Sequence, residues 1–139
     1  MAIWGIGAYY DNEVDRTEDF VREGLACIGW PPDESPSVHE LFRRLRVGDI
    51  VYIKAFPPGG PLFVKAIGIV LDDSHRPHPS LKTCVEVGWV WRGYDHRIEI
   101  EGDRYNVRRN TLYEELHPVV QAEVLRLLLS GLQPPDAPR

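Results

Sequence analysis

The sequence lacks the features that direct a chain into a membrane or a secretion route. None of its apolar runs approaches the roughly 20 residues that a membrane-spanning helix needs. The amino-terminal segment Met1–Gly5 has neither the basic start nor the long apolar stretch of a signal peptide. At 139 residues the chain is long enough for one domain with a substantial core. We therefore expect a single cytoplasmic domain with no membrane partner.

Cysteine is scarce, because Cys27 and Cys84 are the only two. Each lies in an apolar stretch that predicts burial, and cytoplasmic proteins usually keep their thiols reduced. We therefore expect two separate thiols in the core, and a disulfide between them is the alternative.

The chain also has no excess of basic residues. Its 16 Lys and Arg and 21 Asp and Glu give a formal net charge of −5. Because proteins that bind a nucleic-acid duplex usually carry a basic surface, any contact with nucleic acid must be local. A solvated charged face is the ordinary role of exposed arginines. The candidates for contact with a nucleic-acid backbone are Arg43, Arg44, Arg46, Arg104, Arg108 and Arg109.

Sequence motifs of common catalytic machineries are missing as well. There is no Gly-x-Ser-x-Gly, no glycine-rich phosphate loop, and no cysteine with a histidine nearby. Residues 72–78 include two aspartates and two histidines, but their spacing fits no common zinc pattern and Arg76 interrupts them. We interpret this segment as a solvated loop, and we predict no metal, no cofactor and no catalytic residue.

One carboxylate stands out, because Glu86 lies in an otherwise apolar strand where burial would raise its pKa. Lys54 and Lys65, on neighbouring expected strands, are its candidate partners. A structural ion pair is the favoured interpretation, and acid–base catalysis is the alternative.

The pattern of apolar residues predicts an α+β fold in one domain over residues 1–132, with a proline-rich tail over 133–139. The expected strands cover 2–10, 25–30, 50–56, 62–71, 83–91 and 97–101, with a polar loop at 72–80. Helices are expected from Thr17 to Gly24, from a cap at Ser37, and from 110 or 111 to Gly131 with a break at Pro118. The first strand is apolar on both faces and should be central. Hairpins favour a mostly antiparallel barrel of five or six strands, flanked by short helices.

Aromatic residues make up 10% of the chain and include four tryptophans. Aromatic rings pack well in cores, and they also stack on nucleobases. Trp30 directly precedes Pro31 and Pro32, so it should lie at the rim of the sheet rather than in the core. Strand alternation places Val85, Val87, Trp89 and Trp91 on one face of their strand.

Three segments in a fixed order resemble a known family. They are the apolar segment 25–30 that ends in Trp30, the Gly-Asp strand 48–56, and the return strand 63–70. Over residues 2–71 the chain resembles the PUA-like superfamily, and within it the EVE and YTH-like branch. The resemblance implies a five- or six-stranded PUA-like β-barrel that binds a modified base or nucleotide in an aromatic cage.

The resemblance also implies where the ligand binds. Trp30 matches the cage tryptophan, the segment 9–12 with Tyr10 and Asn12 would form one wall, and the strand end 54–56 would form the floor. Trp89 or Trp91 would supply the second cage aromatic. The residues implied to bind the ligand are Trp30, Tyr10, Asn12, Lys54, Ala55, Phe56, Trp89 and Trp91.

The sequence therefore predicts a non-enzymatic module that recognises a modified nucleobase in DNA or RNA, or a free nucleotide, in nucleic-acid modification or phage defence. One alternative is a small enzyme of the related ASCH branch, which would act on a modified nucleoside through Lys54 or Lys65 with Glu86. The other alternative is a protein-interaction module, because the helical C-terminus, residues 112–132, has more leucines than one buried side needs and could form a homodimer.

Overall fold

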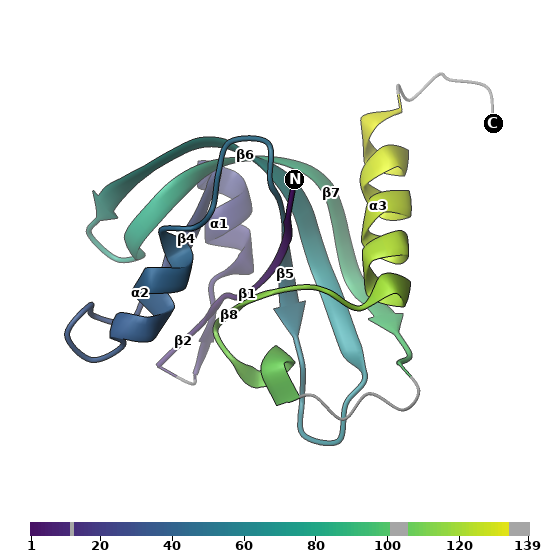
Figure 1. Ribbon diagram of the computed structural model, residues 1–139, viewed down its shortest axis with the longest axis horizontal. Coiled ribbons are helices and arrows are strands. Elements are labelled where there is room, and N and C mark those ends of the chain that lie inside the picture. Colours follow the sequence, from purple (N-terminus) through teal and green to yellow (C-terminus); the bar gives the residue numbers. More distant parts are fainter. Residues whose placement is uncertain (12, 101–105, 134–139) are drawn as a thin grey trace.

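The computed structural model describes residues 1–11, 13–100 and 106–133 (Figure 1). The fold is α+β, as expected, and its main sheet is mostly antiparallel and strongly curled. The described strands form a half-barrel, so the expected closed barrel is not observed. The spatial order is β4 (Leu25–Ile28), β7 (Lys82–Ile98), β6 (Leu62–His78), β5 (Ile50–Ala55), β1 (Ile3–Gly7) and β8 (Leu112–Glu114). A separate ribbon pairs β2 (Tyr9–Tyr10) with β3 (Val14–Asp15).

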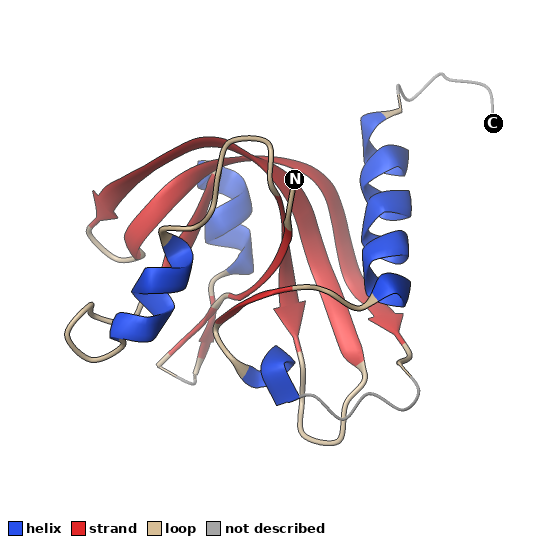
Figure 2. Ribbon diagram, viewed as in Figure 1, coloured by secondary structure: helices blue, strands red, loops and turns tan. Residues whose placement is uncertain are grey.

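Helices pack on both faces of this sheet; Figure 2 shows the helices in blue and the strands in red. Helices α1 (Thr17–Glu23) and α2 (Pro36–Phe42) cover one face, and α3 (Pro118–Leu132) covers the other. A short 3-10 helix, η1 (Asn106–Arg109), precedes β8. Within the described part of the chain, no helix is both long and apolar enough to cross a bilayer.

The first helix follows its sequence signals, whereas the expected strand 2–10 divides into β1 in the main sheet and β2 in the separate ribbon. β1 lies between β5, which is parallel to it, and β8, which is antiparallel, so its central position is confirmed. α1 ends at Gly24, whose φ of 68° is the left-handed conformation that glycine adopts without strain.

The start of α2 differs from the prediction. The helix begins at Pro36 with Ser35 as its N-cap residue, so the expected cap at Ser37 is wrong. Proline has no N–H to donate and its φ is already helical, which suits the first turn of a helix.

The long hairpin of β6 and β7 corrects two predictions. β6 continues through the expected loop 72–80 as far as His78, and β7 includes the expected separate strand from Arg97. Shifts of register around Asp72 let the paired strands bend while their backbones keep hydrogen bonding. The polar side chains in this segment therefore indicate that the end of the hairpin is exposed to solvent, not that the strand is interrupted there.

The C-terminal third corrects another prediction. Residues 112–114 form β8 beside β1, not the first turn of a helix. Pro118 starts α3, where His117 Nδ1 accepts a hydrogen bond from the Val119 backbone N–H at 3.2 Å. The helix also continues past its expected end at Gly131. A β-carbon there would lie only 2.7 Å from the Val90 carbonyl oxygen, so glycine permits the close approach of α3 to β7.

Two apolar clusters lie on opposite faces of the sheet. Trp89 packs with the cluster under α1 and α2, whereas Trp91 packs with the cluster under α3. The prediction that these tryptophans share a face is wrong, because β7 has one extra residue between the partners of Ile67 and Gly68. Such a bulge reverses the alternation beyond it.

The structure also corrects the expectation of two separate thiols. Cys27 on β4 and Cys84 on β7 form a disulfide, and both residues are fully buried. They are direct partners in the antiparallel register, with Cα atoms 4.1 Å apart. Directly opposed residues in an antiparallel pair come this close at the positions without backbone hydrogen bonds, so register alone brings the sulfur atoms together.

Candidate functional site

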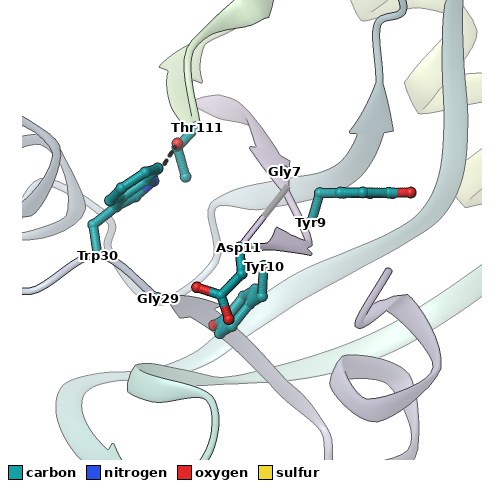
Figure 3. Close-up of a pocket in the computed structure, with 7 residues that line it drawn as sticks. All are labelled: Gly7, Tyr9, Tyr10, Asp11, Gly29, Trp30 and Thr111. Atoms are coloured by element: carbon teal, nitrogen blue, oxygen red, sulfur yellow. Dashed lines mark hydrogen bonds between the residues drawn. The ribbon is translucent and has the colours of Figure 1, made fainter. Parts of the chain in front are cut away.

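Trp30 lies just beyond β4 at the rim of the half-barrel, where its proline neighbours predicted it. The residue is 46% exposed, although hydrogen bonds fix both its indole and its backbone carbonyl. The indole Nε1 donates a hydrogen bond to Thr111 Oγ1 at 3.1 Å (Figure 3), and the backbone carbonyl is 2.6 Å from His39 Nε2. An exposed indole in a fixed orientation offers a flat surface for stacking.

A small open pocket of about 50 Å³ lies beside this indole. Its lining comes from the end of β1, from β2 and the turn after it, from the residues just beyond β4, and from the residue before β8: Gly7, Tyr9, Tyr10, Asp11, Gly29, Trp30 and Thr111. A volume of this size holds a few water molecules. A larger flat ligand would therefore lie against Trp30 with one edge in solvent.

The base of the pocket is tightly built. A β-carbon on Gly29 would lie 2.7 Å from the ring of Tyr10, so only glycine fits there. Tyr10 is fixed because its hydroxyl donates to the Leu81 carbonyl oxygen at 2.6 Å, and burial raises the pKa of its phenol. Tyr9 also lines the pocket, but Figure 3 shows its ring pointing away from Trp30.

Asp11 contributes the acidic group of the pocket. Its φ of 56° lies in the left-handed region, which aspartate tolerates better than most residues. Figure 3 shows its carboxylate on the side of the pocket where Trp30 lies. A carboxylate in this place can accept hydrogen bonds from an amino group of a ligand.

Lys54 lies at the end of β5, paired with Gly7 in the parallel register. Its Nζ is 3.6 Å from the place where a β-carbon of Gly7 would be, and 5.9 Å from the centre of the Tyr113 ring. No hydrogen bond or ion pair joins this amine to any other described residue. Burial without an acidic partner lowers the pKa of Lys54 to about 8. The amine therefore changes charge at mildly alkaline pH, beside a residue of the pocket.

The Lys54 pKa predicts how the stability of the protein depends on pH. Between pH 8 and 10.5 the unfolded chain binds the proton that the folded protein has released, so the free energy of unfolding should rise with pH. Lys54→Met should remove that rise and stabilise the protein at pH 7 by up to ~3 kcal/mol. Urea unfolding at pH 7, 9 and 10.5 would measure both effects. Lys82→Met, at an exposed lysine, is the control, and matching pH profiles for all three proteins would contradict the prediction.

The other residues of the expected floor and cage lie elsewhere. Phe56 lines a separate hollow of about 380 Å³ formed by the turn after β5 and the end of β7. Ala55 lines neither this hollow nor the pocket beside Trp30. Trp89 is partly buried against the core, and its Nε1 donates to the Phe20 and Leu25 carbonyl oxygens at 3.0 and 3.1 Å. Trp91 packs edge-on against His96. Neither tryptophan lines the pocket, and Asn12 lies outside the described residues.

The candidate arginines divide into three groups. Arg108 is buried against Glu115, so its guanidinium is already engaged inside the protein. Arg43 pairs with Glu40, and Arg46 donates to backbone carbonyls at the end of α2. Arg44 and Arg109 are exposed and have no partner among the described residues, and Arg104 lies outside them.

The acid–base set of the enzyme alternative is not assembled. Glu86 is 3.9 Å from Arg76, and Lys65 pairs with Asp15 at 2.6 Å. Glu86 is opposite Asp72 on β6, whereas Lys54 is opposite Val64, near the other end of that strand. At about 3.3 Å per residue, this separates them by roughly 25 Å along β6.

The leucine-rich helix is only partly covered. Val120, Val124, Leu127 and Leu128 are buried against the sheet, whereas more than half of Leu129 and Leu132 is exposed. A homodimer through this helix remains a prediction.

Sequence reasoning missed three residues of the pocket: Gly7, Gly29 and Thr111. Thr111 reaches the site because Gly7 N–H donates to its carbonyl oxygen at 2.8 Å where β8 joins β1. No local pattern signals that long-range pairing. The comparisons with protein-family models and with curated proteins found no match to this chain.

Proposed function

We propose that this protein is a binding module that takes one modified nucleobase out of its stack and holds it against Trp30. The observation that carries the proposal is a tryptophan that is 46% exposed, yet has its indole fixed by Thr111 beside an open pocket. Removing a base from a duplex costs a few kcal/mol, and stacking on an aromatic ring returns about 1–3 kcal/mol. Single-stranded nucleic acid, where the base is already free, is therefore the favoured target.

The polar groups around the pocket suit a base with an exocyclic amino group. The Asp11 carboxylate can accept from the amino group of cytosine or adenine, as acidic side chains do with cytosine. Below pH 8 the Lys54 ammonium can attract a base carbonyl. A methyl group on the base adds about 0.8 kcal/mol for each buried carbon, a modest but selective gain. The sequence resemblance to the EVE and YTH-like branch favours the same ligand class.

Trp30→Ala tests the proposal directly. We expect affinity for single-stranded oligonucleotides with 5-methylcytosine or N6-methyladenine to fall roughly 10- to 100-fold, because the stacking surface is lost. Fluorescence anisotropy with modified and unmodified oligonucleotides would measure the change. Tyr94→Ala is the matched control, because Tyr94 is a 77% exposed aromatic outside the pocket. Equal binding of every oligonucleotide by wild type and Trp30→Ala would refute the proposal.

A further inference from the structure

Besides the pocket in Figure 3, Trp30 borders another hollow, which we call the second hollow. It is distinct from the hollow that Phe56 lines. The second hollow has a volume of about 350 Å³ and shares only Trp30 and Thr111 with the pocket. Its remaining lining comes from α2, the residue before it, and the segment from Arg109 to β8. The hydrogen-bonded pair of Trp30 and Thr111 therefore lies between the pocket and the second hollow.

The polar side chains of the second hollow are free to bind a ligand. Within the described chain, no hydrogen bond or ion pair occupies the side chains of Ser35, Ser37, Arg109 or Asn110. Arg109 brings a positive charge, and none of the lining residues is acidic. Guanidinium, amide and hydroxyl groups are the donors that proteins use for phosphate and sugar oxygens. The pocket on the other side of Trp30 differs, because its charged residue is Asp11.

The pocket and the second hollow together suit a chain of nucleotides better than a single nucleoside. A base in the pocket must direct its sugar and phosphates outward, and the second hollow adjoins the pocket at Trp30 and Thr111. We propose that the second hollow holds the phosphodiester and sugar of the adjoining nucleotide, so that the ligand is a single-stranded polynucleotide. This inference rests on the proposed function and adds the class of ligand to it.

Such a site also fits the overall charge of the protein. With a net charge of −5, the surface as a whole repels a polyanion. Arg109, which has no acidic partner in the described part of the chain, lies beside uncharged donors and permits contact with one phosphate without a broad basic face. The affinity should therefore depend only weakly on salt, with a slope near that of a single phosphate contact.

The test compares nucleosides with short oligonucleotides. The probes are 5-methyl-2′-deoxycytidine and N6-methyladenosine, and single-stranded oligonucleotides with the same base at the centre. Wild type should bind the oligonucleotide at least roughly tenfold more tightly than the nucleoside. Arg109→Ala should weaken oligonucleotide binding roughly fivefold to tenfold, reduce the salt slope by about 0.7, and leave nucleoside binding unchanged. Arg126→Ala removes an equal charge from an exposed part of α3 and should change neither.

The outcomes separate this inference from the proposed function. If nucleoside and oligonucleotide bind equally and Arg109→Ala changes neither, the second hollow is not a subsite, while the Trp30 pocket stands. If Arg109→Ala and Arg126→Ala weaken oligonucleotide binding equally, the effect is general electrostatics and the inference is overturned. If no modified probe binds more tightly than its unmodified counterpart, the proposed function itself fails.

Discussion

Arg108→Met is expected to lower the free energy of unfolding by about 3–5 kcal/mol, the usual cost of leaving a buried charge without its partner. Arg108 and Glu115 are 3% and 2% exposed. The guanidinium donates to both oxygens of the Glu115 carboxylate, at 3.0 and 2.7 Å. Without it, the hydrogen bonds that the carboxylate keeps among the described residues come from the Tyr52 hydroxyl and the His117 backbone N–H, which do not neutralise its charge.

A surface pair on the same protein gives the matched control. Arg97 and Glu99 are 2.6 Å apart but 59% and 69% exposed, so Arg97→Met should cost less than about 1 kcal/mol. The double variant Arg108→Met with Glu115→Leu should recover part of the loss, because no buried charge is then left alone. Urea denaturation of all four proteins would measure these differences. Similar losses for the two single variants would contradict the burial argument.

Reduction of the Cys27–Cys84 disulfide should also destabilise the protein strongly. The two residues are 57 positions apart, and cross-linking a loop of that length removes unfolded-state entropy worth up to ~4 kcal/mol. We expect dithiothreitol to move the urea midpoint to a lower concentration by a corresponding amount. The double variant Cys27→Ala with Cys84→Ala should show no response to the reductant. An unchanged wild-type midpoint under complete reduction, checked by thiol titration, would contradict the prediction.

The sequence predicted best those features that depend on neighbouring residues. The buried β1, the helix that ends at Gly24, and the position of Trp30 before two prolines all follow from local patterns. The errors arise where distant segments meet. Residues 112–114 become a strand only because β1 offers an unpaired edge, more than a hundred residues earlier in the chain.

In the candidate site too, local patterns were informative, whereas the effects of long-range strand pairing were not predicted. Trp30 and Tyr10 were found from the sequence, and both line the pocket. Trp89 and Trp91 were not distinguishable as core residues, because the bulge in β7 and the hydrogen bonds of Trp89 appear only after the strands are paired. The disulfide was missed for a related reason. Two cysteines in apolar strands carry no signal of the register that places them directly opposite one another.

The short strand β8 joins the pocket to the buried ion pair of Arg108 and Glu115. Thr111 precedes it and fixes the Trp30 indole, while Glu115 follows it and is locked by Arg108. The indole therefore loses much of its rotational freedom when the chain folds, before any ligand arrives. Because less side-chain entropy remains to be lost on binding, more of the stacking free energy can appear as affinity.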